Sequence, residues 1–204
     1  MTMQDTMKHG GPMESHIKAR QKYWFTSDNH FFHKNVLKFC EVTRQGTDVN
    51  DMNELMIAKW NSQVGIKDVV YLNGDFSFAS WAKTLPILER LNGILHLVRG
   101  NHDGWIKPET EIFFESIQDY KEISIEGIKV IMFHYPIEEW NHMHRGAFHL
   151  FGHVHGGHGE KPGRSMDIGI DARPQCDMGL WEWEEIKEKL LAKPILEHHG
   201  KMEE

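Results

Sequence analysis

The chain has few cysteines, no long hydrophobic run and no excess of basic residues. Its two cysteines, Cys40 and Cys176, are far apart and form no CxxC pair, which argues against a disulfide framework and against a zinc site built from thiolates. No stretch approaches the roughly 18 consecutive apolar residues of a membrane-spanning helix, and no apolar signal segment opens the chain. We therefore expect a cytoplasmic protein with no membrane partner.

Positive charge is also scarce. Lys and Arg together number 23, whereas Asp and Glu number 30, so the formal net charge at pH 7 is -7. Proteins that bind duplex nucleic acid through its phosphates use many clustered Lys and Arg side chains. A nucleic-acid partner is therefore not favoured, whereas a small phosphate ligand held through metal ions suits this charge. The sequence does not indicate an oligomeric state.

The length and apolar content predict one folded domain. The chain has 204 residues, of which 40% are hydrophobic, and this is enough for a substantial core. Residues 1–20 are polar and lack hydrophobic periodicity, so we expect a flexible leader there. We expect the domain over residues 21–193 and a polar tail over residues 194–204.

Helical and strand-like patterns alternate in the first half of the chain. Strands are expected at residues 23–26, 68–72 and 94–98, with helices at 53–64 and 81–91 between them. Later segments predict a hairpin at 122–125 and 128–133, strands at 148–151 and 166–170, and a closing helix at 181–191. This order predicts one α/β domain whose mixed sheets are covered by helices.

Histidine is abundant, with 15 residues, and six histidines lie in short clusters rich in Asp, Asn and Gly. Each cluster directly follows an expected strand. Ligands of open α/β sheets bind at the carboxyl ends of strands, where loops present side chains on a rigid base. We expect five such strand ends to meet in one crevice, namely Asp28 to His30, Gly74-Asp75, Gly100 to Asp103, His134, and Gly152 to His155.

These residue types are typical of metal ligands. Asp, His and Asn offer mixed oxygen and nitrogen donors, a set suited to Mn, Fe, Co, Ni or Zn in two-metal hydrolase centres. Strand spacing places the side chains of Asp28 and His30 on one side of the chain, where both can bind one ion. His153 and His155 share this spacing, although a turn there would send their rings to different ions.

The motifs DxH, GD, GNHD, a single His and GHxH occur in this order and resemble those of the calcineurin-like metallophosphoesterases. The resemblance covers roughly residues 22–193. Within it, the phrases FTSDNHFFHKNV, VVYLNGDFSF and HLFGHVHG are similar to the compact phosphoesterases of bacteria and their phages. The resemblance implies an α/β fold in which two mixed β-sheets pack as a sandwich flanked by helices, in a single domain. It also implies a phosphoric ester hydrolase.

The resemblance further implies two divalent metal ions that share one carboxylate. Manganese is the first expectation for both ions, with Fe, Ni, Zn or Co as alternatives. A water activated by the ions would be the nucleophile. The first ion would be bound by Asp28, His30, Asp75 and His155, and the second by Asp75, Asn101, His134 and His153.

The GNHD motif also supplies the expected catalytic residues. His102 would protonate the leaving oxygen, and Asp103 would orient a neighbour or begin the next turn. Many relatives read GDxxDR, where the second Asp positions the catalytic His and the Arg binds phosphate, but this chain reads GDFSFA. The residue that orients His102 is therefore not identified, and the protein Ser/Thr phosphatase branch is disfavoured.

Three residues near the DxH motif are candidate phosphate contacts: His33, Asn35 and Arg44. Each has a plainer interpretation as well, since a loop histidine is often a surface residue and an arginine is often solvated or paired.

Three functions stay open from the sequence. The first is a metal-dependent phosphoesterase that hydrolyses phosphodiesters, and phosphomonoesters as an alternative, in small or nucleotide-like substrates. The second is a nuclease acting on nucleic-acid ends, which would need a basic channel that this acidic chain does not show. The third is a catalytically silent metal-binding interaction module, which would have no need of His102 as an acid.

Overall fold

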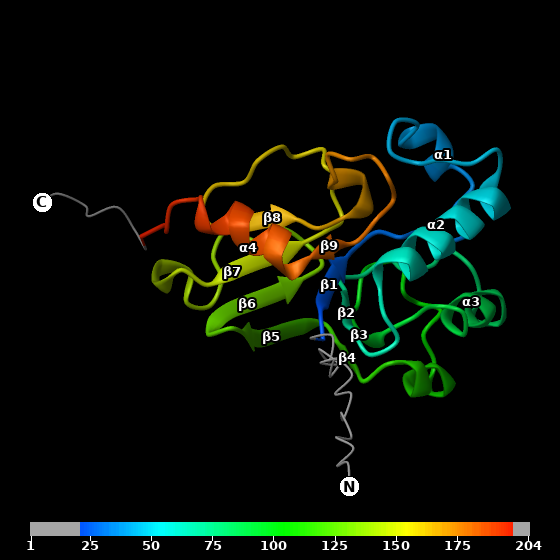
Figure 1. Ribbon diagram of the computed structural model, residues 1–204, viewed down its shortest axis with the longest axis horizontal. Helices are drawn as coiled ribbons and strands as arrows, with labels where there is room; N and C mark the ends of the chain where they lie inside the picture. Colours follow the sequence, from blue (N-terminus) through cyan, green and yellow to red (C-terminus); the bar gives the residue numbers. More distant parts are fainter. Residues whose placement is uncertain (1–20, 198–204) are drawn as a thin grey trace, which may run out of the picture.

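The computed structural model describes residues 21–197 (Figure 1). The expected leader at 1–20 and residues 198–204 of the expected tail lie outside the described residues. The first sheet has the strand order β4-β3-β2-β1-β9, in which the first four strands are parallel and β9 is antiparallel to β1. Its strands are β1 (Tyr23–Thr26), β2 (Val69–Leu72), β3 (Ile94–Val98), β4 (Ser116–Gln118) and β9 (Trp181–Glu182).

The second sheet has the strand order β5-β6-β7-β8. Strands β5 and β6 form the predicted antiparallel hairpin, whereas β6, β7 and β8 are parallel. Both sheets are therefore mixed, as predicted. The strands of this sheet are β5 (Tyr120–Ile125), β6 (Ile128–Phe133), β7 (Phe148–Phe151) and β8 (Ser165–Asp167).

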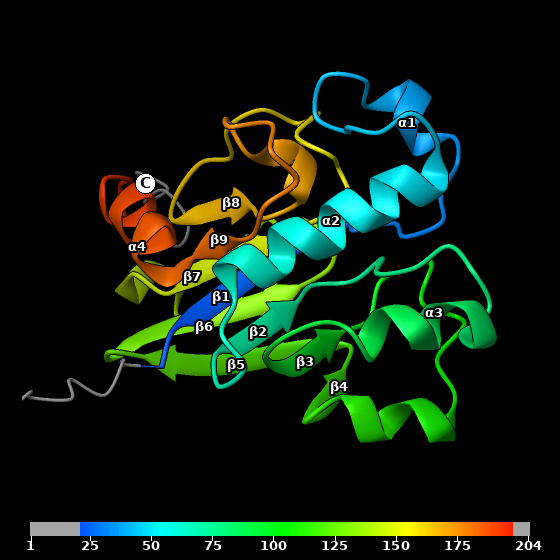
Figure 2. The same ribbon diagram turned by 45° about the vertical axis from the view of Figure 1, so that its right-hand side comes forward.

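The two sheets pack face to face and are flanked by helices, which confirms the predicted sandwich (Figure 2). Side chains such as Phe25 in the first sheet and Val130 and Leu150 in the second form a buried core between the sheets. Helices α2 (Val49–Gln63) and α3 (Trp81–Leu88) pack on the other face of the first sheet, where Trp60 and Leu72 share a second core.

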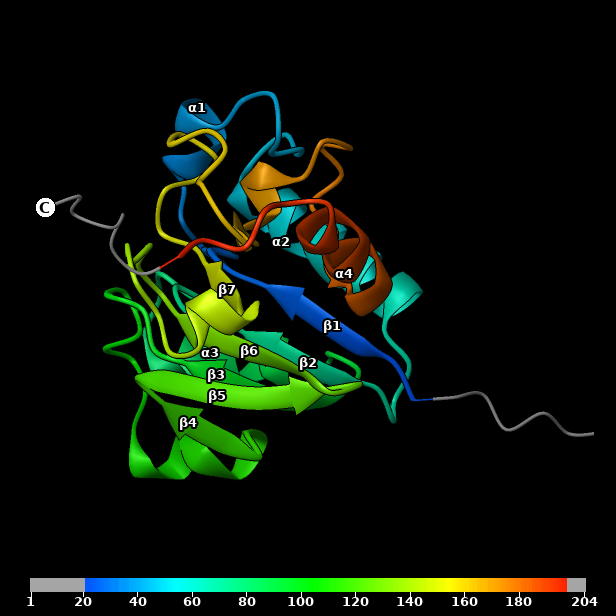
Figure 3. The ribbon, with the colours of Figure 1, turned by 90° about the vertical axis from the view of Figure 1, so that its left-hand side faces the viewer.

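Helix α4 (Trp183–Leu191) lies beside β1 (Figure 3). Its Ile186 and Leu190 belong to the core between the sheets. The remaining short elements are α1 (Val36–Phe39), η1 (Pro108–Phe113), η2 (Met143–Arg145) and η3 (Ile170–Ala172). None of the described helices has the length and hydropathy needed to cross a bilayer.

Several predicted elements differ from the structure in their bounds. Helix α2 begins four residues earlier than residue 53, because the carboxylate of Asp48 accepts hydrogen bonds from the backbone N–H groups of Asn50 and Asp51 and caps the first turn. The closing helix begins after Trp181, since that residue pairs with Phe25 of β1 and extends the sheet. Strand β8 ends before residue 168, and the chain continues into η3.

Polar contacts join the two sheets at the carboxyl ends of their parallel strands. The side-chain amide of Asn73, which follows β2, donates to the carbonyl oxygens of Phe133 at 3.0 Å and Leu150 at 3.3 Å. The hydroxyl of Ser27, which follows β1, donates to the Asn73 carbonyl at 2.7 Å. These buried bonds hold the strand ends of both sheets at fixed positions.

Candidate metal centre

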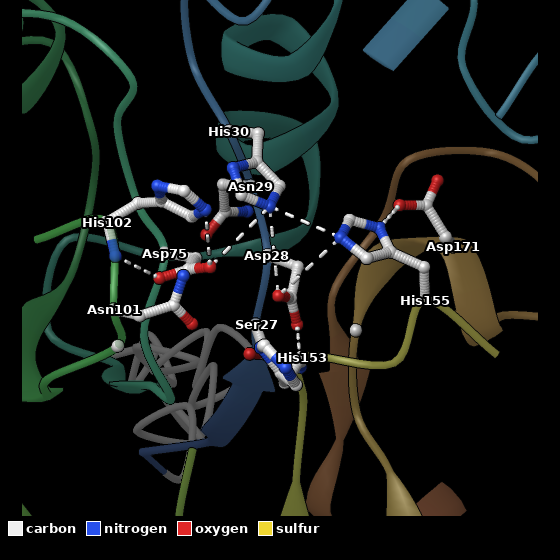
Figure 4. A network of polar contacts seen from close by, with 12 residues as sticks. Ser27, Asp28, Asn29, His30, Asp75, Asn101, His102, His153, His155 and Asp171 are labelled. Carbon is white, nitrogen blue, oxygen red and sulfur yellow. Dashed lines mark hydrogen bonds and ion pairs between the residues drawn. The ribbon is translucent and has the colours of Figure 1, made fainter. Parts of the chain in front are cut away.

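The sequence-predicted ligands lie together where the five strands end (Figure 4). Three of the strands belong to the first sheet and two to the second, so the crevice lies between the two sheets. The residues that follow β1, β2, β3, β6 and β7 are, respectively, Asp28 and His30, Asp75, Asn101 and His102, His134, and His153 and His155.

Asp28, His30 and His155 form a first cluster, whose ligand atoms all lie within 4.8 Å of one another. The Nε2 atoms of the two imidazoles face each other at 3.2 Å, and the rings are nearly parallel, with an interplanar angle of 10°. Asp28 Oδ1 lies 3.8 Å from each of these nitrogens. The three side chains therefore converge on one point.

Asp75, His134 and His153 form a second cluster, again with ligand atoms within 4.8 Å. The carbonyl oxygen of the Asn101 side chain lies 3.2 Å from His134 Nε2 and also accepts a hydrogen bond from the Tyr135 hydroxyl at 3.3 Å. A carboxylate, an amide oxygen and two imidazoles form a donor set that divalent transition metals accept.

Asp75 belongs to the second cluster but also faces the first. Its Oδ2 is 3.8 Å from His30 Nε2 and 3.4 Å from His134 Nε2, so one carboxylate oxygen faces both groups of ligands. Its Oδ1 accepts a hydrogen bond from the backbone N–H of His102 at 2.8 Å. Asp75 is therefore placed where a carboxylate shared by two ions would lie.

Asp28 divides its two oxygens in the same way. Oδ2 accepts the backbone N–H of His153 at 2.8 Å, whereas Oδ1 is buried and has no hydrogen-bond partner. The carboxylate is fully buried, and an unpaired buried carboxylate oxygen costs free energy unless a cation neutralises it. This oxygen and the two facing imidazole nitrogens of the first cluster fit a bound divalent ion.

The backbone is strained at the ligands. Within residues 21–197, ten non-glycine residues have positive φ, and five of these are predicted ligands with φ values between 48° and 71°. Each left-handed residue of this kind costs on the order of 1–3 kcal/mol and persists where the surroundings fix it. Here loop hydrogen bonds and sheet ends fix the strained residues, which are Asp28, His30, Asp75, His153 and His155.

Burial dominates the protonation of Asp28 and His30 in the first cluster. It raises the pKa of the Asp28 carboxyl to about 6, an effect that His134 and His155 oppose. It also lowers the pKa of His30 to about 3, against the opposing charge of Asp75. His30 is therefore a neutral imidazole at pH 7, which is the form that binds metal.

Burial acts to raise the pKa of Asp75, but the hydrogen bonds of its carboxylate with His134 and with the His102 N–H lower it overall. Asp75 is therefore ionised at neutral pH and provides the negative charge between the clusters.

His102 stands beside Asp75 at the mouth of the crevice, with 40% of its side chain exposed. Its Nε2 lies 4.0 Å from Asp75 Oδ2. Within residues 21–197 its ring has no hydrogen-bond partner that would orient it, and it packs against the ring of Phe78 with a centroid distance of 4.6 Å.

Asp103 is buried and holds two loops rather than facing the crevice. Its carboxylate accepts the backbone N–H groups of Gly100, Asp75 and Phe76 at 2.8–3.0 Å and the indole N–H of Trp105 at 3.1 Å. It orients neighbouring backbone, which is one of the two roles expected for it, and its carboxylate has no contact with the ring of His102.

The prediction that Arg44 contacts phosphate is wrong, because all of its N–H donors are already used within the protein. Its guanidinium is fully buried. All of its N–H groups face neighbouring atoms: both oxygens of Asp171 at 2.8 and 2.6 Å, the carbonyls of Asp28 and Asn29, and the sulfur of Met56. Arg44 therefore fixes the loop that carries Asp28.

Asp171 is the site residue that the sequence analysis missed. Its Oδ2 lies 2.7 Å from Nδ1 of His155, and it is the carboxylate bound by Arg44. Burial opposes the ionisation of Asp171, but His155 and Arg44 bring its pKa well below the usual range. The ionised carboxylate accepts a hydrogen bond from Nδ1–H of His155 and so directs the Nε2 lone pair towards the first cluster.

The other two candidate phosphate contacts, His33 and Asn35, lie in the segment that follows the DxH motif. The ring of His33 is 5.4 Å from that of His30 and 4.1 Å from that of Phe78. Asn35 is exposed at the start of α1 and makes no side-chain capping bond. Of these two, His33 alone has a ring contact with a predicted ligand.

Comparison with known proteins places the chain in a family. No family model matches it. The uncharacterized protein MJ1445 of Methanocaldococcus jannaschii is 31% identical over 142 residues, which cover 69% of this chain and 73% of that protein. The chain belongs to the family of MJ1445. A shorter stretch of 84 residues, 40% of the chain, is 34% identical to 39% of the Gene 66 protein of Mycobacterium phage L5.

A solved structure shows the same fold. The protein AQ665 of Aquifex aeolicus, whose function is unknown, aligns with a TM-score of 0.63 and 21% identity over 83% of this chain and 99% of that one. A novel archaeal phosphodiesterase aligns with a TM-score of 0.41 and 15% identity over 79% and 98% of the two chains, which is too weak a similarity to bear on function. The activity must therefore be argued from the site.

Proposed function

We propose that the chain is a dinuclear metal-dependent phosphoesterase of the cytoplasm, which hydrolyses phosphodiesters of small or nucleotide-like substrates. The observation that supports it is the pair of Asp and His clusters that share the carboxylate of Asp75, with the exposed imidazole of His102 beside them. A two-metal centre is suited to in-line displacement at phosphorus because two cations can stabilise both the attacking and the leaving oxygen.

The first cluster, with Asp75, would hold one divalent ion, and the second cluster, with Asn101, would hold the other. We propose manganese for both. When bound, the ions supply Lewis acidity and a water activated for attack. The buried carboxylates of Asp28 and Asp75 hold charge at this point, and the loop hydrogen bonds described above fix their positions before substrate arrives.

His102 would donate a proton to the leaving oxygen. Its imidazole is partly exposed, lies at the mouth of the crevice and is not bound to another side chain, so it can reach a substrate above the clusters. A positioned general acid contributes about 100- to 10,000-fold to a rate.

The test is hydrolysis of bis-p-nitrophenyl phosphate and p-nitrophenyl phosphate by metal-stripped protein, with Mn, Ni, Zn and Mg added back separately. We expect turnover that requires metal and is faster for the diester. His102→Ala should bind the same amount of metal and lose at least about 100-fold in kcat. The loss should be larger for a diester with an alkoxide leaving group, because p-nitrophenolate departs with little need of a proton.

Two results would contradict the proposal. Absence of turnover with every metal, in protein that binds two ions per chain, would favour the silent metal-binding module. Equal activity of His102→Ala and the unsubstituted protein on both kinds of leaving group would remove His102 as the acid and leave the metal centre standing.

A further inference from the structure

Exposed apolar side chains border the candidate metal centre on the side of His102. We define Phe78, His33 and Phe39 as the aromatic flank. The ring of Phe78 is 47% exposed, lies 4.6 Å from the ring of His102 and meets that of His33 edge-on at 4.1 Å. The ring of Phe39, which is 75% exposed, continues the row 6.5 Å beyond His33.

The flank is continuous with a hollow beside the first cluster. A cavity of about 220 Å³ begins at Phe39 and reaches the ligand His155. Val42, 81% exposed, forms part of its wall. The flank and the cavity therefore meet at Phe39, and the cavity extends to the metal ligand His155.

The chemistry of Phe78 indicates what the flank can bind. A phenyl ring cannot orient His102 by a hydrogen bond, and it cannot form an ion pair with a phosphate. The exposed ring of Phe78 therefore needs another explanation. Exposed apolar patches next to a polar site are typical of ligand-binding surfaces. Aromatic faces stack on nucleobases without regard to the identity of the base.

We infer that the aromatic flank receives the nucleobase of a nucleotidyl phosphodiester whose phosphate lies at the metal clusters, with Phe78 as the specificity-determining residue. The inference rests on the proposed function and deepens it. The flank consists of three side chains, and the chain carries a net charge of -7, so the substrate is a mononucleotidyl or dinucleotidyl diester rather than a polymer that needs a basic track.

The test compares two diesters that differ only in their bases: thymidylyl-(3′→5′)-thymidine and its counterpart with a tetrahydrofuran abasic residue at both positions. Both are incubated with the manganese-loaded full chain and excess alkaline phosphatase, and inorganic phosphate is measured. We expect kcat/KM to be about tenfold higher for the dinucleotide than for the abasic diester. Bis-p-nitrophenyl phosphate is measured beside them, and its hydrolysis tests the proposed phosphoesterase activity.

Substitutions then assign the preference to the ring. Phe78→Leu keeps apolar bulk and removes the aromatic face, so the ratio of the two kcat/KM values should fall at least about fivefold. Phe78→Trp should keep the ratio within about twofold, because stacking survives. Ile66→Ala, an exposed apolar residue before β2 and hence at the opposite end of the sheet from the site, is the matched control and should keep the ratio of the unsubstituted protein.

The outcomes separate the two proposals. Hydrolysis of bis-p-nitrophenyl phosphate with equal rates on the dinucleotide and the abasic diester would overturn the inference and leave the phosphoesterase standing. A preference for the dinucleotide that survives Phe78→Leu unchanged would also overturn it. Absence of hydrolysis of all three diesters would overturn both.

Discussion

Asp171 acts on the first cluster through His155, by fixing which ring nitrogen carries the proton. An imidazole that binds metal through Nε2 must carry its proton on Nδ1, and the ionised carboxylate 2.7 Å away accepts a hydrogen bond from that N–H. Arg44 keeps the carboxylate ionised and also binds the carbonyls of Asp28 and Asn29. The same guanidinium thus ties together two loops of the first cluster.

Asp171→Asn should weaken metal binding by about 10- to 100-fold, the usual effect of removing a partner that orients a ligand. The amide can donate its N–H to Nδ1, which favours the tautomer with its proton on Nε2, where the metal must bind. Isothermal titration of metal-free protein with Mn²⁺ measures the change. Asp119→Asn, at a carboxylate that is 79% exposed, is the control. Equal affinities in the two variants would show that Asp171 has no positioning role.

The sequence predicts single residues well where they occur in motifs. The side chains of DxH, GD, GNHD, the single His and GHxH converge in the structure because parallel strands end at one edge. Asp171 belongs to no motif, and its contact with Arg44 joins residues 127 positions apart in sequence. Arg44 was predicted as a phosphate contact because a sequence does not show which carboxylate will saturate a guanidinium.

Strands β1 and β7 belong to different sheets, and a glycine allows the residues that follow their carboxyl ends to pack closely. A Cβ atom on Gly152 would collide with Ser27 Oγ and with Asp28 Oδ2. Asp28 Oδ2 is also the atom that accepts the His153 N–H, so the first cluster depends on the absence of a side chain at this point.

Gly152→Ala should lower the free energy of unfolding by about 1–3 kcal/mol, since overpacking forces neighbouring atoms to shift. It should also weaken metal binding, because the shift displaces Asp28. Urea unfolding and Mn²⁺ titration measure the two effects. Gly104→Ala is matched to it, as a Cβ there has no neighbour within 4 Å, and its stability should change by less than about 0.5 kcal/mol. A Gly152→Ala variant as stable as the control would contradict the close approach.

At the level of elements, segments with helical spacing or an apolar run were predicted, whereas β4 and β9 were not. Helical spacing in 53–64 located α2, and the apolar run at 94–98 located β3. Strand β9 has two residues and owes its existence to pairing with β1, while β4 has three and pairs only with β3. Such strands leave no alternation in the sequence, because their partners in the sheet determine them.

The arrangement of two packed sheets was predicted from the family resemblance and not from hydrophobic patterns. Alternating strands and helices predicted a mixed α/β domain, but which strands share a sheet is a long-range property. Asn73 is an example of such a long-range contact, since its side chain donates hydrogen bonds to two strands of the other sheet. No local sequence pattern predicts these bonds.

At the scale of the whole molecule, the core contains a buried, neutral histidine outside the metal centre. His149 of β7 is fully buried. Its Nδ1 lies 3.3 Å from the Ile131 carbonyl, and its Nε2 accepts the backbone N–H of Ile137 at 3.3 Å. Burial lowers its pKa from 6.5 to about 4, and the bond to Ile131 opposes this. Protonation of Nε2 would break the bond to Ile137 and bury a charge.

This depressed pKa makes the stability of the metal-free protein depend on pH. Between pH 6.5 and 4 the unfolded chain takes up a proton at His149 and the folded chain does not, so the stability due to this residue is complete above pH 6.5 and falls as the pH drops to 4. Because one pKa unit corresponds to about 1.4 kcal/mol, the fall should amount to a few kcal/mol. Urea unfolding at pH 7, 5.5 and 4.5 measures it.

His149→Gln isolates this effect from the titration of the other histidines. Glutamine can replace one of the two hydrogen bonds but takes up no proton, so its destabilisation relative to the unsubstituted protein should be largest at pH 7 and shrink as the pH falls. His158→Gln, on the surface, is the matched control. A difference between His149→Gln and the unsubstituted protein that stays constant from pH 7 to 4.5 would show that His149 titrates alike in the folded and unfolded chains.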